Sequence, residues 1–256
     1  MALCSRFSSR VENYLKFKPH YPKKLIDFLY EECGFSWESV IAEIGSGMGV
    51  FSRLLLERGS RVVGIEPDEE MRSAAERILC DEFPRFVSLG VTAENTTLSD
   101  ASVHHIVCTQ SFHCIDLDRS KEEFARILRP GGSLVLIRSK QITEGNDFTA
   151  EYEELIKRFA RTDGDTGLRY DGQQDYRKLF SSGPYMALSI PGQLILDFEG
   201  VKGRLLACSD VPNAGEDGYD AMLEELQILF ELYSQSGKVT LYYETQAHAG
   251  RLSLAG

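Results

Sequence analysis

The residues best suited to chemistry lie in one short stretch, where Gly45, Gly47 and Gly49 alternate with other residues directly after an apolar run. An amphipathic pattern follows from Phe51. This order predicts a buried strand, a tight turn and a helix. Glycines permit positive φ and let a ligand lie against bare main chain, and the N-terminus of the helix offers free N–H groups. The stretch is therefore a candidate ligand-binding turn.

Two carboxylates accompany this turn. Glu43 stands two residues before the first glycine, and Glu66 ends the predicted strand 61–66, 21 residues after Gly45. That distance is close to the ~20 residues expected for an acid that binds a ribose. A carboxylate accepts hydrogen bonds from both ribose hydroxyls, whereas it repels a 2′-phosphate. Glu66 is therefore predicted to bind a ribose that carries no phosphate.

The glycine spacing separates two nucleotide-binding patterns. A dinucleotide fingerprint has glycines at its first, third and sixth positions, but here the sixth position is Val50 and the third glycine comes one residue early. The run Glu-x-Gly-x-Gly-x-Gly resembles the first motif of the class I S-adenosylmethionine-dependent methyltransferases. The resemblance implies S-adenosylmethionine as cofactor and places Glu43 near its methionine end, which carries an ammonium group.

Further segments resemble the same family. Residues 18–22 (Lys-Pro-His-Tyr-Pro) are similar to an Arg-Pro-x-Tyr-Pro element that precedes the first helix in one branch, with Lys18 in place of the arginine. Residues 110–116 resemble the Gln-Ala-Phe-His-Trp-Phe-Asp run of the trans-aconitate-methyltransferase-like branch, with Cys114 in place of the tryptophan. Residues 128–132 (Leu-Arg-Pro-Gly-Gly) precede a predicted strand, as is frequent in this fold.

The resemblance and the residue types together define the candidate site. The cofactor is expected to contact Glu43, Gly45, Ser46, Gly47, Glu66, Pro67, Met71, Thr92, Ala93 and Gln110. Tyr14, Tyr21 and His113 are expected to face the acceptor. His113 is the candidate catalytic residue, because an imidazole can orient or deprotonate an acceptor. Its alternative role is a hydrogen bond within a loop, and the alternative for Met71 is plain core.

Neither histidines nor acids predict a metal site. His104 and His105 are adjacent on a predicted strand, so they face opposite sides and are interpreted as structural. Asp163 and Asp165 lack the glutamate that an EF-hand calcium loop requires. The six cysteines show no paired spacing and are interpreted as reduced intracellular thiols.

Composition limits the partners. The net charge of −11 disfavours a nucleic-acid backbone or an anionic membrane, and the four lysines between Lys16 and Lys24 are interpreted as a solvated face. No apolar run approaches the ~18 residues of a membrane span, and residues 1–10 lack a signal-peptide core. The expected location is the cytoplasm, with an Arg/Ser-rich transit peptide as the alternative. The expected state is a monomer or homodimer.

The fold expected from pattern and resemblance is an α/β, Rossmann-like methyltransferase domain. A mostly parallel seven-stranded sheet has helices on both faces, and its last two strands form an antiparallel edge. The single domain covers 1–256, with a core at about 36–144 and 236–250, a helical cap at about 145–235 and an N-terminal lid at about 10–33. We expect Pro130 to stop a helix that continues through Arg129, and Pro191-Gly192 to break a strand.

The function expected is methyl transfer to the oxygen, nitrogen or carboxylate of a small molecule by in-line displacement. Three alternatives stay open at this point. The first is a nicotinamide oxidoreductase, which the glycine spacing disfavours. The second is a cofactor-binding scaffold or regulatory protein without transfer activity, and the third is a cyclase or isomerase that uses the cofactor structurally.

Overall fold

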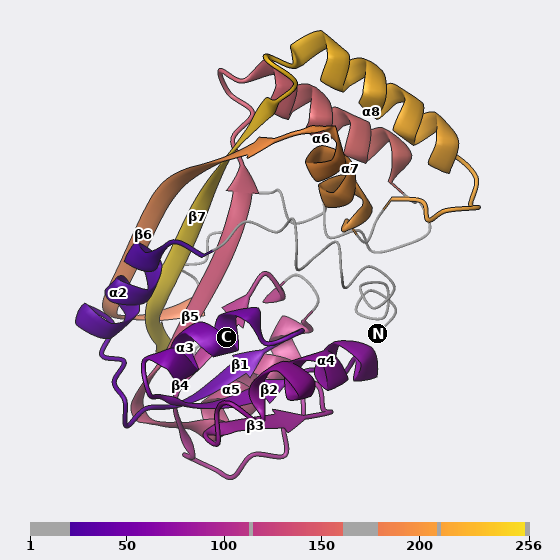
Figure 1. The fold of residues 1–256 in the computed structure, drawn as a ribbon. Coiled ribbons are helices and arrows are strands. Elements are labelled where there is room, and N and C mark those ends of the chain that lie inside the picture. Colours follow the sequence, from indigo (N-terminus) through magenta and orange to yellow (C-terminus); the bar gives the residue numbers. More distant parts are fainter. Residues whose placement is uncertain (1–20, 113–114, 161–178, 209–210, 254–256) are drawn as a thin grey trace. The chain divides into compact units, whose positions relative to one another are not determined.

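The structure is a computed structural model that describes residues 21–112, 115–160, 179–208 and 211–253 (Figure 1). Helices and strands alternate in its first half, and long strands and helices make up the second half. In chain order the elements are α2 Lys23–Glu31, β1 Val40–Ile44, α3 Val50–Glu57, β2 Arg61–Ile65, α4 Glu69–Leu79, β3 Phe86–Leu89, β4 Val103–Thr109, α5 Leu117–Ile127, β5 Leu128–Gln141, α6 Asp147–Phe159, β6 Phe180–Leu196, α7 Phe198–Leu206, α8 Tyr219–Tyr233 and β7 Val239–Leu252.

The strands of the described chain form one seven-stranded sheet in the order β3-β2-β1-β4-β5-β7-β6. β1 pairs in parallel with β2 and β4, β2 with β3, and β4 with β5. β7 runs antiparallel to β5. The Arg138 side chain of β5 donates to the Gln246 side chain of β7, and the Ile142 N–H, just after β5, donates to the Tyr242 carbonyl. The predicted mostly parallel sheet with helices is therefore confirmed.

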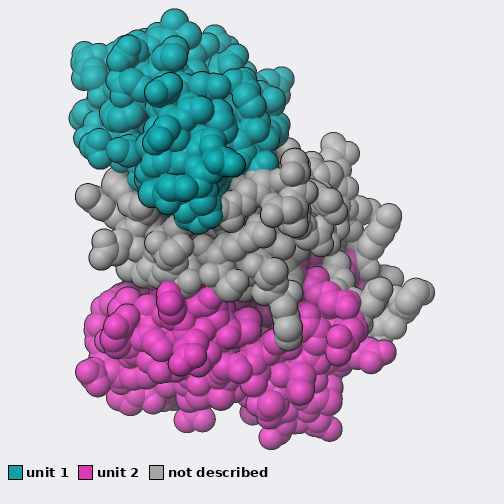
Figure 2. Space-filling model, turned by 90° about the vertical axis from the view of Figure 1, so that its right-hand side faces the viewer, with its two compact units in different colours: residues 1–20, 139–172, 191–244 teal, residues 21–138, 173–190, 245–256 magenta. Residues whose placement is uncertain are grey.

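The chain divides into two compact units, coloured separately in Figure 2. Of the described residues, unit 1 takes 139–160, 191–208 and 211–244, whereas unit 2 takes 21–112, 115–138, 179–190 and 245–253. Every described residue of the candidate site belongs to unit 2. The single-domain boundaries expected from the sequence, including the lid, stay a prediction.

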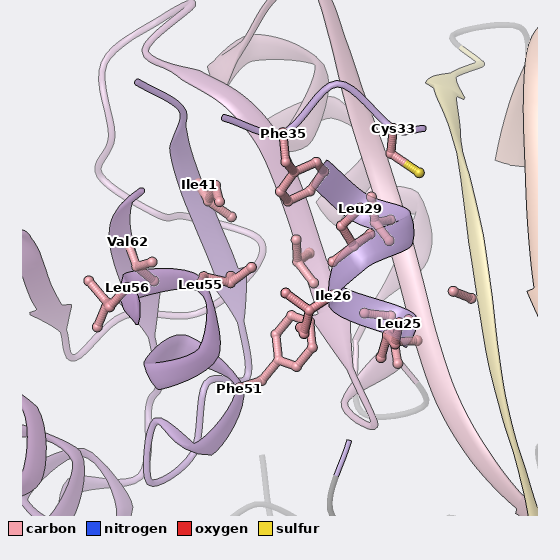
Figure 3. Packing of buried hydrophobic residues seen from close by; sticks show 14 of the residues in the cluster. Leu25, Ile26, Leu29, Cys33, Phe35, Ile41, Phe51, Leu55, Leu56 and Val62 are labelled. Carbon is pink, nitrogen blue, oxygen red and sulfur yellow. The ribbon is translucent and has the colours of Figure 1, made fainter. Parts of the chain in front are cut away.

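Unit 2 buries one apolar cluster on each face of its strands. On one face, Leu25, Ile26 and Leu29 of α2 and Phe51 and Leu55 of α3 pack with residues of the central strands (Figure 3). The other face packs α5 through Phe124 and Ile127. Alternation along β1 explains this, since Ile41 belongs to the first cluster and Ala42 and Ile44 to the second. Two covered faces hold the carboxyl ends of the parallel strands in place.

In the described part of unit 1, three helices and the start of β7 form a separate apolar cluster. Tyr152 of α6, Val201 of α7 and Leu226 of α8 are all at most 1% exposed. Asn146 and Asp197 cap the first two of these helices by accepting backbone N–H bonds. Gly200 and Gly203 lie within α7, although glycine is a weak helix former.

Two predictions about proline were wrong. α5 ends at Ile127, and β5 already begins at Leu128, so Pro130 lies within a strand. The register between β4 and β5 jumps from Val103↔Leu128 to His105↔Ser133, which makes the segment with Gly131 (φ 84°) a bulge. Likewise β6 continues through Pro191-Gly192 without a break, because β6 is the edge strand of the sheet, where proline is tolerated.

Candidate cofactor site

The candidate cofactor residues follow four neighbouring parallel strands. Gly45–Gly47 follow β1, Glu66 follows β2, Thr92 comes three residues after β3, and Gln110 follows β4. These strands stand next to one another in the order β3-β2-β1-β4. Ligands of open α/β sheets bind beyond the carboxyl ends of the strands. The fold thus brings the four segments predicted for the cofactor to one edge of unit 2.

The three glycines of the loop meet different surroundings, although each has positive φ. A Cβ on Gly45 would lie 2.3 Å from the side chain of Ser111, and one on Gly49 would lie 2.4 Å from Leu79 of α4. A Cβ on Gly47 would meet only the end of Met71, at 3.7 Å. Gly45 and Gly49 therefore serve close packing, and Gly47 is the glycine whose main chain stays open to a ligand.

Gly47 and Glu66 are directly joined, and we call this pair the loop–acid clamp. The Gly47 N–H donates to Glu66 Oε2 at 2.8 Å, and the Asp68 N–H donates to Oε1 at 2.9 Å. Burial raises the pKa of Glu66, whose side chain is 6% exposed, and the two N–H donors partly offset this. Each oxygen keeps a second lone pair, so the clamp leaves acceptors for two hydroxyl groups.

Ser46 and Met71 support the clamp from either side. The N–H groups of Gly45 and Ser46 both donate to the Ile65 carbonyl, at 2.8 and 3.2 Å. The Ser46 side chain is buried over Gly64, where a Cβ would lie 2.8 Å from its Oγ. Met71 is buried in α4, and neighbouring Pro67 is exposed. The Ser46 carbonyl also accepts from the Gly49 N–H at 2.9 Å, so the backbone of Ser46 holds the loop in place while its hydroxyl packs against the sheet.

The start of α4 is fixed by two polar side chains. Asp68 is the N-cap and accepts from the Met71 N–H at 3.0 Å. Arg72 donates to the Glu66 carbonyl at 3.3 Å, and a Cβ on Gly90 would lie 2.8 Å from its guanidinium. The guanidinium therefore bridges the residues that follow β2 and β3, and holds Glu66 from the main-chain side.

Glu43 is buried in β1, with 1% exposure. The Thr109 hydroxyl at the end of β4 donates to Oε1 at 2.9 Å, and the Ser52 hydroxyl of α3 donates to Oε2. Glu43 thus joins a strand on one side and a helix on the other. Burial, together with the charge of Glu43, raises the pKa of the Cys108 thiol.

The segment after β3 is held by an acid that the site prediction did not include. The Thr92 hydroxyl bonds to the Glu94 carboxylate, which also accepts from the Asp116 N–H at 3.2 Å. The carboxyl is partly buried, which raises its pKa, but these donors and Arg119 outweigh burial and leave the pKa lowered. Ala93 is buried in the second apolar cluster. The Thr92 hydroxyl is therefore engaged, and the backbone of 91–93 is what remains for an adenine.

The segment after β4 turns sharply. Gln110 has φ 59°, which is uncommon for a non-glycine residue, and its N–H donates to the Ile137 carbonyl at 2.9 Å. Ser111 then donates to the Ile44 carbonyl at 2.5 Å. This turn places the half-buried Gln110 beside the glycine loop, because Ser111 is the residue that packs on Gly45.

Of the three residues expected to face the acceptor, the structure describes Tyr21. The ring of Tyr21 packs edge-on against Phe51 of α3, with centroids 4.8 Å apart. This contact places Tyr21 over the first turn of the helix that follows the glycine loop. Tyr14 and His113 lie outside the described residues.

Several residues that shape the site were not predicted from the sequence. Ser52, Thr109 and Ser111 hold Glu43 and Ile44 across separations of 9, 66 and 67 residues. No local spacing signals the contacts of Thr109 and Ser111, since these two arise from strand order. Asp68 had a local signal, an acid before the acidic first turn of α4, which is the usual pattern of an N-cap.

The two histidines of β4 are structural, as predicted. His104 Nδ1 accepts from the Val40 N–H at 2.9 Å. His105 stacks on Phe35, with the ring centroids 3.9 Å apart. Burial lowers the pKa of His105 to about 4. Within the described residues, no group of three or more His, Cys, Asp or Glu side chains is arranged to hold a metal ion.

Strand order, glycine loop and ribose-type acid together define the class I methyltransferase fold. Comparison with known proteins agrees. Residues 42–136 match the family described as "Methyltransferase domain". The chain is 34% identical over 168 residues to an uncharacterized methyltransferase of Mycobacterium tuberculosis, a match that covers 63% of this chain and 64% of that relative. The chain is thus a homologue of methyltransferases, and S-adenosylmethionine is the cofactor that this family implies.

Solved structures show the same fold over nearly the whole chain. A protein of Anaeromyxobacter dehalogenans, provisionally named a type II methyltransferase, has 24% identity and a TM-score of 0.66, and covers 92% of this chain and 98% of its own. One of Anabaena variabilis, provisionally named a methyltransferase from an antibiotic biosynthesis pathway, has 21% identity and a TM-score of 0.60, with 92% and 98% covered. At these identities the likeness shows the fold alone.

The match spans slightly less than two thirds of the mycobacterial relative's length, so it does not establish the activity of the whole protein. In the part of the chain that the structure describes, no helix has the length and apolarity to cross a membrane.

Proposed function

We propose that this protein transfers the methyl group of S-adenosylmethionine to a small-molecule acceptor. The loop–acid clamp carries the proposal, because it puts an open glycine and a buried carboxylate in direct contact at the end of adjacent strands. A ribose fits this arrangement: its two hydroxyls can donate to the free lone pairs of Glu66, and the open side of Gly47 admits the adenosyl group against the main chain. The methyltransferase homologues support the same reading.

The main task of the protein in methyl transfer is to orient the acceptor and the cofactor. When bound, the cofactor supplies a methyl group already activated by a sulfonium. The residues of the site would only have to hold the acceptor in line with that methyl group. Holding acceptor and methyl in line is worth roughly 7–11 kcal/mol. Glu66 and the backbone at Gly47 and 91–93 would hold the cofactor, with Gln110 beside them.

The acceptor class is the finer part of the proposal. By resemblance of residues 110–116 to the trans-aconitate-methyltransferase-like branch, we propose a small acid or phenol. His113 would orient it, or remove its proton if it is a phenol, and Tyr14 and Tyr21 would line its pocket. Composition supports a cytoplasmic monomer or homodimer.

The test has two stages. Differential melting with S-adenosylhomocysteine against NAD should show stabilisation by the first alone. Small acids, phenols and amines are then incubated with labelled cofactor, and products are read by mass spectrometry. A labelled product that His113→Ala reduces, without loss of S-adenosylhomocysteine binding, supports the proposal. Binding without product from any acceptor class favours the scaffold or cyclase alternative, and stabilisation by NAD favours the oxidoreductase.

A further inference from the structure

We propose that two exposed surfaces of this protein, opposite in charge, bind each other between two copies of the chain. The first is the outer face of α8, which we call the acidic face and define by Glu224, Ile228, Glu231 and Leu232. The second lies at the amino ends of β2 and β3, and we call it the basic edge and define it by Trp37, Arg61, Arg85 and Val87. The inference concerns self-association and does not depend on the proposed function.

The acidic face carries two large apolar side chains in the open. Ile228 is 66% exposed and Leu232 is 72% exposed, while the opposite side of α8 packs into the apolar cluster of unit 1. Helix residues that are three, four or seven positions apart share a face, so Glu224 and Glu231 lie beside the two apolar side chains. The last turn of α8 has no basic residue, so the negative end of the helix adds to these charges. This face therefore suits a partner that is both apolar and basic.

The basic edge also has apolar side chains in the open. Trp37 is 60% exposed and Val87 is 45% exposed, and Val87 belongs to the edge strand β3. The guanidinium of Arg85 lies over the Trp37 ring, 5.8 Å from its centroid, and donates to the Trp37 and Gly59 carbonyls at 2.8 and 2.6 Å. Tryptophan and arginine are enriched among the residues that dominate binding between proteins. An indole held in place by a guanidinium is thus well suited to anchor a partner.

The positive charge of the basic edge is not balanced within the described residues. The register between β2 and β3 puts Arg61 beside Arg85 on the same face of the sheet. Neither arginine belongs to an ion pair of the described chain, and two like charges so close repel each other. The acid nearest in sequence to Trp37, Glu38, interacts electrostatically with His104. A negatively charged partner would therefore relieve the repulsion at this edge.

A second copy of the chain meets both requirements. Its acidic face offers two carboxylates with two apolar side chains, and its basic edge offers two guanidinium groups with an indole and a valine. Contact of one acidic face with another would instead oppose like charges. Two copies that each use both surfaces make the contact once in each direction, which closes a dimer.

Sedimentation equilibrium of the full chain tests the pairing by charge reversal. The basic-edge variant is Arg61→Glu with Arg85→Glu, and the acidic-face variant is Glu224→Arg with Glu231→Arg. Each variant alone opposes like charges in every contact between copies. A mixture of the two variants, or one chain with all four substitutions, brings opposite charges together again. Leu232→Ser tests the apolar part of the contact without a change in charge.

We expect the wild-type chain to associate, and each two-residue variant to associate at least roughly tenfold more weakly. The mixture and the chain with four substitutions should recover association, and Leu232→Ser should weaken it. Arg77→Glu and Glu122→Arg change exposed charges outside both surfaces and should behave like the wild type. A wild-type chain that stays monomeric at its highest soluble concentration, or a mixture that associates no better than either variant alone, overturns the inference. Binding of S-adenosylhomocysteine to each variant tests the proposed function separately.

Discussion

The two buried glutamates of unit 2 and a buried tyrosine of unit 1 differ in their hydrogen bonding. In unit 2, Glu43 and Glu66 are at most 6% exposed, and both oxygens of each accept a hydrogen bond. In the described part of unit 1, the hydroxyl of Tyr152 is buried without a partner, amid an apolar cluster. Burial also raises the pKa of that hydroxyl. The two glutamates are thus held by hydrogen-bond donors, whereas Tyr152 is held by apolar packing.

Burying the carboxyl group of Glu66 lowers the stability of unit 2. A carboxyl group whose pKa is raised in the folded state, as that of Glu66 is, stabilises the fold only while protonated. The contribution is lost as the pH rises through the folded pKa of Glu66. A buried, aligned carboxylate is what a binding site needs and what a stable core avoids.

The largest expected effect concerns Gly49, the packing glycine of the loop. Gly49→Ala should destabilise unit 2 by about 3 kcal/mol, because its Cβ would lie 2.4 Å from fully buried Leu79 and because φ is +74°. Urea unfolding measures the change. Gly34→Ala is the control: φ is +78° but nothing lies within 4 Å, so only about 1–2 kcal/mol of backbone strain is expected. Equal losses would mean that α4 does not restrict the loop.

A smaller effect is expected at Glu123, which anchors the segment after β3. Arg126 and Thr96 hold the pKa of Glu123 down to about 2. A lowered pKa stabilises the fold above the ordinary value near 4.5, and this contribution is lost as the pH falls toward 2. Glu123→Gln should cost roughly 2 kcal/mol at pH 7 and flatten the fall in urea midpoint between pH 5 and pH 3. A variant with the wild-type slope would contradict the assignment.

The smallest effect is expected in unit 1. Tyr152→Phe removes a hydroxyl that is buried without a partner and keeps the ring that stacks on Phe148. Stability should stay level or rise by up to about 1 kcal/mol, as read from thermal melting. A clear loss would show that this hydroxyl does make a bond, and the contrast with the two glutamates would then weaken.

The sequence predicted what is local and missed what is long-range. The glycine loop and Glu66 could be predicted because spacing along the chain encodes a turn and an adjacent strand end. The sequence could not predict that the surroundings of Gly45, Gly47 and Gly49 differ, since these depend on contacts with Ser111 and Leu79. The bulge at Pro130 was mistaken for a helix stop because proline ends helices more often than it interrupts strands. In the same way, the contact of Thr109 with Glu43 depends on β4 lying beside β1.

The central claim is that the clamp between Gly47 and Glu66 binds the ribose of the cofactor. Calorimetry of S-adenosylhomocysteine with Glu66→Ala tests it most directly, with Glu69→Ala, an exposed acid of the same helix start, as control. Loss of two hydrogen bonds to a charged group should weaken binding roughly 100-fold or more, while Glu69→Ala binds like the wild type. Unchanged affinity in Glu66→Ala would contradict the account.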